Sequence, residues 1–370
     1  MTQEAARVGL DRSVGWGGLL MWALGSVLAG LASCGPASTS SDWDAAIGFY
    51  RQKVARDPRL YPAYAQLGAS YLARARVTLD PADVAAAREA LDRSVQIQPS
   101  FAAYKTMAAV SNFSHRFNDA IRWAQRAHEA SPEDGAVTAQ LVEAYLGLGR
   151  IDDAAALLQL DQPPADYYRV VAMGHWLAAQ PRMDDAVDAY VAAAQLAREA
   201  QVDELAVWAQ VRAAGLVLDA GRADEARQYL EAGARLRPDD FWLRVHQAEL
   251  REAEGRLDEA LAIYERLLRQ TPNPTIHAQA WAVARRLGRP DRARRHFKAA
   301  DAGLRRALDA GEVYTLEALA ALYLEADVEL DRARELAQRN LEFNPAASAR
   351  ALLASIEQRL DAAGLDADSP

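Results

Sequence analysis

The sequence predicts an all-α protein built from stacked pairs of antiparallel helices, and three observations indicate this fold. An alanine recurs at intervals close to 34 residues, a proline follows most of these alanines by twelve residues, and an Asp or Asn precedes nearly all of them by two. A repeat of this length with helical filling is typical of a helix-turn-helix solenoid, in which each pair packs only on its neighbours. About eight helix pairs with capping helices at the ends are expected.

The clearest unit extends from Gly255 to Pro272. Gly255 is expected to end one helix, and Pro272 to stop the next. Ala260 and Tyr264 lie one turn apart and share a face of that second helix. Measured between equivalents of Ala260, the intervals are 41, 33, 34, 32, 40, 34, 33 and 40 residues. The repeat-packing positions are therefore Ala46, Ala87, Ala120, Ala154, Ala186, Ala226, Ala260, Ala293 and Ala333.

The residue two positions before the repeat alanine is interpreted as a helix N-cap, as at Asp258. A short side-chain acceptor there would take the free backbone N–H groups of the first turn. The longer intervals are expected to come from added residues at a turn or a helix end. One such insertion lengthens the connection between Arg74 and Pro81, and the Pro163-Pro164 pair marks the expected break in the superhelix.

Several first helices carry a further pattern: Tyr64-x-x-Leu67-Gly68-x-x-Tyr71, Leu141-x-x-x-Tyr145-x-x-x-Gly149, and Met173-Gly174. With the repeat alanines, these residues make the chain resemble a tetratricopeptide (TPR) repeat protein over roughly residues 43–360. The resemblance implies a right-handed superhelical solenoid in which the first helix of each pair lines a concave groove. It also implies protein or peptide partners and no small-molecule cofactor.

The first 42 residues differ from the repeats. Arg7 and Arg12 precede an uncharged run that ends in Leu31-Ala-Ser-Cys34, and Cys34 is the only cysteine. This segment resembles a secretory signal that closes in a bacterial lipobox, which implies cleavage before Cys34 and lipidation of its sulfur. Residues 1–33 are then the signal peptide, 34–42 a flexible tether, 43–360 the solenoid and 361–370 a disordered tail. The alternatives are an uncleaved membrane anchor and a wrongly assigned start codon.

The lipoprotein resemblance favours a position in the cell envelope, on the periplasmic face of the outer membrane. Gly35 follows the cysteine in place of the Asp often associated with inner-membrane retention. The net charge of −9 argues against general nucleic-acid binding, because that activity needs a basic surface.

The expected groove carries two tryptophans, Trp208 and Trp242, at the same place in successive units. Aromatic side chains beside an arginine are typical of a binding hot spot, although packing between repeats would explain both tryptophans equally well. The residues that the register places in this partner-binding groove are Lys105, Asn112, Tyr168, His175, Trp208, Arg212, Trp242, His246 and Arg285.

A basic segment follows the groove residues, from Arg285 to Arg306. It predicts either a solvated helix face or a docking patch for an acidic protein, an anionic lipid head group or a glycan phosphate. The candidate patch residues are Arg286, Arg289, Arg292, Arg295 and Lys298.

The sequence shows no familiar catalytic or metal-binding signature. No two of its six histidines stand three or four residues apart, which excludes a ready metal pair on one helix. The acidic pairs Asp152-Asp153 and Asp184-Asp185 fall at helix starts, where capping explains them better than acid–base chemistry. No catalytic residue, metal or cofactor is therefore assigned.

These observations favour a non-enzymatic scaffold or adaptor that holds other proteins and assists assembly of an envelope complex. Two alternatives remain at this stage. One is a ligand-binding or envelope-sensing module that uses Tyr168, Trp208 and Trp242, and the other is an enzyme whose site is assembled across helices.

Overall fold

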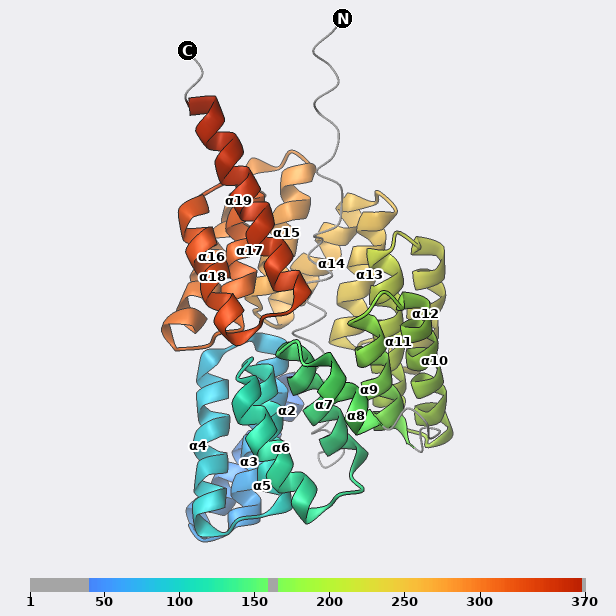
Figure 1. Ribbon diagram of the computed structural model, residues 1–370, viewed down its shortest axis with the longest axis vertical. Coiled ribbons are helices and arrows are strands. Elements are labelled where there is room, and N and C mark those ends of the chain that lie inside the picture. Colours follow the sequence, from blue (N-terminus) through green and yellow to red (C-terminus); the bar gives the residue numbers. More distant parts are fainter. Residues whose placement is uncertain (1–39, 159–165, 368–370) are drawn as a thin grey trace, which may run out of the picture.

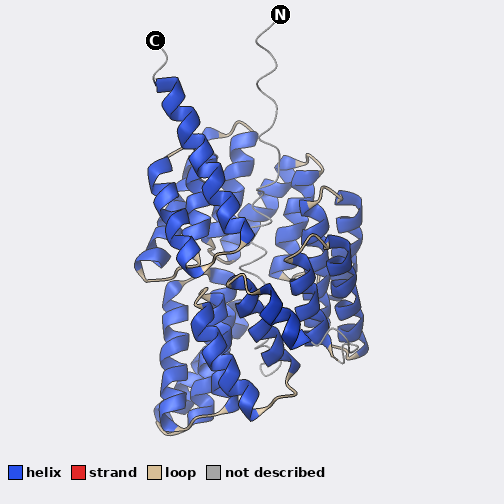
Figure 2. Ribbon diagram, in the orientation of Figure 1, coloured by secondary structure: helices blue, strands red, loops and turns tan. Residues whose placement is uncertain are grey.

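The computed structural model describes residues 40–158 and 166–367, and these residues form helices joined by short turns (Figures 1 and 2). Eight antiparallel pairs stack in order, which confirms the predicted α-solenoid in the described part of the chain. The first helices are α3 (Tyr61–Thr78), α5 (Phe101–Phe113), α7 (Gly135–Gly147), α9 (Tyr167–Ala178), α11 (Asp203–Asp219), α13 (Phe241–Ala253), α15 (Pro274–Arg286) and α17 (Thr315–Ala326). The second helices are α4 (Pro81–Ile97), α6 (Phe117–Ala130), α8 (Ile151–Leu158), α10 (Met183–Glu199), α12 (Ala223–Leu236), α14 (Leu257–Gln270), α16 (Pro290–Asp309) and α18 (Leu330–Phe343).

Two further helices stand at the ends of the stack, α2 (Ser40–Arg56) and α19 (Ala347–Ala367). The sequence places the end of the closing helix at Leu360, but α19 continues through Gly364 to Ala367. A single glycine inside a helix costs only about 1 kcal/mol, so it does not end the helix by itself.

The repeat alanines lie where neighbouring helices come closest. Ala87, Ala120, Ala154, Ala186, Ala226, Ala260 and Ala333 are completely buried, and Ala293 is 7% exposed. Ala46 is only half-buried, because it lies on α2, which packs on α3 and has no preceding helix pair in the described part of the chain. Eight of the nine predicted packing positions are thus buried between helices.

The predicted N-caps at the second helices are wrong. The cap of α14 is Arg256, whose side chain makes no capping hydrogen bond, and Asp258 lies inside the first turn. At α10 the cap position is likewise occupied by an arginine, Arg182, and Asp184 and Asp185 lie in the first turn that follows it. A carboxylate in the first turn still interacts favourably with the helix dipole, which explains why acids recur there. Side-chain caps occur instead at five first helices, at Ser100, Asp134, Asp166, Asp240 and Asn273. Asp80 caps the second helix α4 in the same way.

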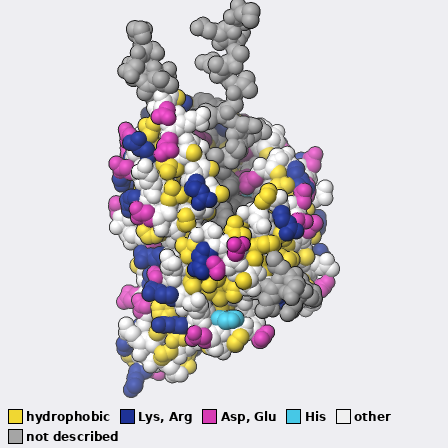
Figure 3. Space-filling view, viewed as in Figure 1, with side chains coloured by type: hydrophobic (Ala, Val, Ile, Leu, Met, Phe, Trp, Pro, Cys, Tyr) yellow, Lys and Arg dark blue, Asp and Glu magenta, His cyan; other side chains and the backbone are white. Residues whose placement is uncertain are grey.

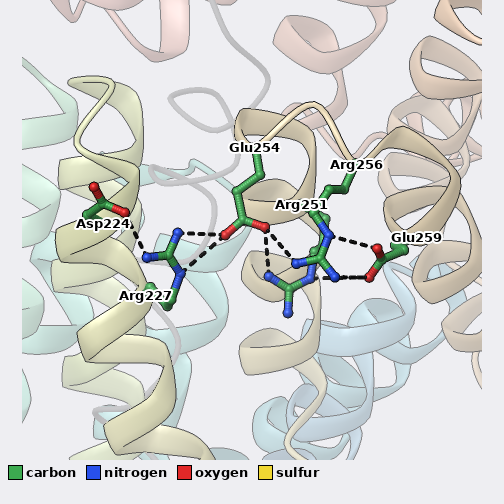
Figure 4. A network of polar contacts seen from close by, with 6 residues as sticks. All are labelled: Asp224, Arg227, Arg251, Glu254, Arg256 and Glu259. Atoms are coloured by element: carbon green, nitrogen blue, oxygen red, sulfur yellow. Dashed lines mark hydrogen bonds and ion pairs between the residues drawn. The ribbon is translucent and has the colours of Figure 1, made fainter.

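The first-turn acids take part in ion pairs with arginines at the same edge of the stack. Figure 4 shows one network, in which Arg227 of α12 contacts both Asp224 and Glu254. Glu254 also accepts hydrogen bonds from Arg251 at 2.9 Å and Arg256 at 3.1 Å. These contacts link α12, α13 and α14, although each exposed pair contributes only a few tenths of a kcal/mol.

The insertion after Arg74 lengthens a helix and not a turn. Helix α3 continues to Thr78, and Leu79 ends it in the left-handed conformation at φ 53°. The extra turns bring the end of α3 to the other end of the solenoid, where the backbone oxygen of Val77 accepts a hydrogen bond from Asn273 Nδ2 at 2.6 Å. The oxygen of Leu79 accepts one from the Tyr314 hydroxyl at 3.3 Å.

The first and last helix pairs therefore touch, and the stack closes on itself (Figure 1). Arg88 of α4 pairs with Glu312 at 2.8 Å, and Arg116 donates to the backbone oxygen of Gly311 at 3.2 Å. The rings of Phe113 and Tyr314 pack with centroids 5.3 Å apart. Contacts between residues about 200 positions apart make the solenoid a closed superhelical turn.

The expected break at Pro163-Pro164 lies outside the described residues. On either side of it, α7, α8 and α9 share one apolar cluster, which contains Val142, Leu146, Ala154 and Ala172. Helix α7 also packs directly on α9. The helices that flank this segment therefore belong to one continuous stack.

Candidate partner-binding surface

The first helices lie toward the inside of the superhelix. In Figure 1, α11 and α13 are nearer the centre of the molecule than α10 and α12. The side chains that the sequence assigns to a groove come from these inner helices. The structure places several of them in contacts within the protein.

Lys105 and Asn112 tie one helix pair to the next. The Lys105 ammonium lies 3.0 Å from a carboxylate oxygen of Asp134, the cap of α7. Asn112 is fully buried, and its Nδ2 donates to the backbone oxygen of Gln140 at 3.0 Å and to Glu143 Oε2 at 3.2 Å. Both side chains hold α5 against α7.

Trp208 lies in a packed aromatic group. Its side chain is 8% exposed, and its ring centroid lies 5.9 Å from that of His175 and 6.1 Å from that of Tyr190. The guanidinium of Arg212 stacks over the Trp208 ring at 5.8 Å. Burial and the charge of Arg212 lower the pKa of His175 to about 3, so this imidazole is neutral at pH 7. The packing interpretation therefore describes Trp208 in this structure.

His246 belongs to a polar chain along α13 and α15. Its Nδ1 lies 2.5 Å from Glu249 Oε2, and the other oxygen of Glu249 accepts from Gln279 Nε2 at 2.8 Å. Nearby, Glu252 accepts from the Tyr264 hydroxyl at 2.9 Å, and burial raises its pKa to about 7. This carboxyl group is thus close to its titration point at neutral pH.

Tyr168, Trp208 and Trp242 occupy equivalent positions, each 18 residues before its repeat alanine, on α9, α11 and α13. Tyr168 and Trp242 are half-buried, unlike Trp208. The hydroxyl of Tyr168 and the indole Nε1 of Trp242 are both shielded from solvent and have no hydrogen-bond partner among the described residues. An unsatisfied buried polar atom costs about 1–3 kcal/mol, so each of these donors lowers the stability of the fold while it has no acceptor.

The basic segment is largely neutralised by acids from neighbouring helices. Arg286 pairs with Glu252 at 2.8 Å, Arg289 pairs with Asp258, and Arg292 lies 3.5 Å from Glu265. Arg285 donates to the backbone oxygen of Glu325 at 2.7 Å and stacks on Trp281. In Figure 3, basic and acidic side chains likewise lie side by side over much of the visible face.

Three exposed cations of this segment, Arg295, Lys298 and Arg306, have no ion pair within the described residues. The docking patch therefore stays a prediction. Fewer of its positive charges are unpaired than the sequence suggests, because Arg286, Arg289 and Arg292 pair with acids of neighbouring helices.

Sequence reasoning missed the polar contacts around the end of α3. Arg76 is 3% exposed, and burial lowers its pKa to about 9 against the opposing effect of Glu143 and Glu204. Those two acids lie on α7 and α11, so the Arg76 guanidinium is near enough to both helices for their charges to act on it. The only sequence signal was the insertion between Arg74 and Pro81. An insertion does not reveal which helices the added residues will contact.

A search of the described residues for metal sites finds no group of three or more His, Cys, Asp or Glu side chains that could hold an ion. Within the same ranges, no helix has the length and apolar character needed to cross a bilayer. Cys34 and the predicted signal peptide lie outside the described residues.

Comparison with known proteins supports the repeat assignment. The tetratricopeptide repeat family model matches residues 114–173 and 217–287. Among solved structures, a tetratricopeptide repeat protein from Parabacteroides merdae is 16% identical, with 69% of this chain and 98% of that chain covered and a TM-score of 0.42. Yeast Tom70 is 11% identical, with 89% and 87% covered and a TM-score of 0.37.

A monomeric IFIT1 mutant with Gppp-AAAA is 13% identical, with 82% of this chain and 76% of that chain covered and a TM-score of 0.43. No curated protein sequence matches the chain. Structural likeness at these identities concerns architecture alone. Residues 114–173 and 217–287 therefore match tetratricopeptide repeats, and in the described part of the chain they lie within an all-α solenoid.

Proposed function

We propose that this protein is a non-enzymatic scaffold, a lipoprotein anchored through Cys34 that faces the periplasm and assists assembly of an envelope complex. The repeat architecture supports a protein-binding role, because stacked helix pairs present an extended surface to other proteins. The basic N-terminal residues, the apolar run and the Leu31-Ala-Ser-Cys34 ending support the anchor and the position at the outer membrane.

One observation carries the proposed binding surface. Tyr168 and Trp242 come from different helix pairs, stand at the same register and each hold a polar atom without a partner in the described structure. A protein segment that passes along the first helices would supply carbonyl oxygens to both donors once the two side chains turn toward it. Aromatic side chains with one polar atom are well suited to this role, since they offer contact area at low entropic cost.

The test is capture of partners by in-cell crosslinking of the full chain, identified by mass spectrometry, beside a Tyr168→Phe/Trp242→Phe variant. Both substitutions keep an aromatic ring and remove the unpaired donor, and Trp242→Phe also replaces the indole by the smaller phenyl ring. If the two donors bind no partner, the variant captures the same proteins as the parent. Its stability then changes only by the balance between the buried unsatisfied groups that are removed and the packing that Trp242→Phe loses. If the donors bind a partner, stability is retained and one or two envelope proteins disappear from the capture.

A matched control changes two of the free cations, as Arg295→Gln/Lys298→Gln. We expect this control to retain the same partners as the parent chain. If the control loses partners and the aromatic variant captures all of them, the partner contact lies on the basic segment and not at Tyr168 and Trp242. Capture of no reproducible protein by the parent chain would contradict the scaffold.

A further inference from the structure

Helix α2 has an outer face that nothing in the described structure covers. Ile47 packs with Leu67 of α3 and is 5% exposed, and Trp43, one turn before it on the same side of α2, is 8% exposed. The opposite side carries Ala45, Phe49 and Lys53 at intervals of four residues, and all three are exposed. Since residues four apart lie on one helix face, these side chains form a single stripe that Arg56 extends. We call Ala45, Phe49, Gln52, Lys53 and Arg56 the α2 outer face.

Phe49 is the most exposed large hydrophobic side chain of the described residues, at 52%, whereas the other three are valines at 36–40%. A single exposed apolar residue needs no explanation by itself. Phe49 differs because it is aromatic and because the Lys53 ammonium lies 4.7 Å from its ring centroid. An aromatic ring with an adjacent cation is a combination that favours the interface between water and lipid.

The cations of this face are free to act on a partner. Lys53 and Arg56 are exposed and form no ion pair within the described residues. The two nearest aspartates with described side chains are already engaged, because Asp44 pairs with Arg74 and Asp57 accepts from the backbone N–H of Arg59 at 3.0 Å. Many other arginines of the chain are held by carboxylates, as in Figure 4.

We propose that the α2 outer face rests on the anionic phospholipid surface to which the protein is anchored. This inference rests on the proposed lipidation of Cys34. Helix α2 begins at Ser40, six residues after that cysteine, so at most about 20 Å of chain separates the anchor from the helix. A tether this short keeps α2 at the membrane surface, where Phe49 enters the head-group region and Lys53 and Arg56 meet lipid phosphates.

Contact with the membrane would set the orientation of the whole solenoid. A lipid anchor alone leaves the protein free to rotate about its tether. A second contact through α2, the first helix of the stack, fixes which side of the superhelix faces the periplasm. Partner-binding residues on α9 and α13 would then be held away from the bilayer at a defined orientation.

The experiment places an environment-sensitive NBD dye on the lipidated full chain. A cysteine is introduced at Gln52→Cys on the α2 outer face or at Glu231→Cys on α12, both exposed positions. Because Cys34 is the only native cysteine and its sulfur carries the lipid, the introduced thiol is the one that reacts with the dye. The probe surface is a vesicle of phosphatidylethanolamine and phosphatidylglycerol, and mass spectrometry of each preparation reports the lipid on Cys34.

We expect the dye at position 52 to show a blue shift and a several-fold rise in emission on these vesicles, and the dye at position 231 to show neither. The response should fall in a Phe49→Ser/Lys53→Glu variant and in high salt, because charge attraction to lipid is screened. Equal emission from both positions on confirmed lipidated protein would overturn the inference and leave the anchor intact. Absence of lipid on Cys34 would overturn the anchor and, with it, this inference.

Discussion

Glu317→Gln is expected to stabilise the protein at pH 8 by up to about 3 kcal/mol. Glu317 of α17 is 5% exposed, and its Oε2 receives only long hydrogen bonds, from Asn340 at 3.5 Å and Asn344 at 3.4 Å. Its other oxygen has no partner in the described structure. Burial raises the pKa of this carboxyl group to about 7.

The sign of the pH dependence follows from this raised pKa. In the unfolded chain the group titrates near pH 4.3, so between roughly pH 4.5 and pH 7 the folded state binds more protons. Below that window Glu317 is neutral in the folded and in the unfolded state, so its ionisation does not affect the free energy of unfolding. As the pH rises through the window, stability is lost, and above pH 7 the full cost of the buried charge is present.

Urea unfolding followed by circular dichroism at several pH values measures this effect. The parent chain should lose stability between pH 5 and pH 8, whereas the Gln variant should show a flatter dependence and match the parent near pH 4.5. The control is Glu335→Gln on α18, whose carboxylate is 59% exposed and pairs with Arg332. A Glu317→Gln variant with the pH profile of the parent would show that this carboxyl group is not buried.

Ala260→Leu is expected to lower the free energy of unfolding by about 1–3 kcal/mol. Ala260 is completely buried where α14 meets its neighbours, and added methyl groups there force side chains and backbone apart. The matched control is Ala46→Leu at the equivalent position of α2, which is half-buried. We expect this control to cost much less, as judged by the same urea titration.

The comparison of Ala260→Leu with Ala46→Leu separates the effect of overpacking a buried site from the effect of replacing Ala by Leu in a helix. Equal losses at both positions would mean that helix propensity or the unfolded state dominates. No loss at Ala260 would contradict the close helix approach on which the repeat assignment depends.

The repeat architecture could be predicted from the sequence because its signals are local. Ala260 and its equivalents recur at a fixed interval, and each is explained by contacts with adjacent helices. The position of the N-caps could not be predicted in the same way. Asp258 is favourable both as a cap and in the first turn, since either place puts a negative charge at the positive end of the helix.

The closure of the superhelix was beyond sequence reasoning for a physical reason. The hydrogen bond from Asn273 to Val77 joins residues 196 positions apart. Small changes in the angle between successive pairs accumulate along a solenoid, and no local pattern shows whether the ends meet. The same limit applies to Trp208, because the register gives its helix face but not the Tyr190 and Arg212 side chains that cover it.

The central claim is that partners bind along the first helices, at the register of Tyr168 and Trp242. Site-specific photo-crosslinking in cells tests it most directly, with the photoreactive amino acid benzoylphenylalanine at position 168 on α9 or at position 335 on α18. The proposed scaffold predicts a discrete adduct with an envelope protein from position 168 and none from position 335. Adducts from position 335 alone, with none from position 168, would contradict it.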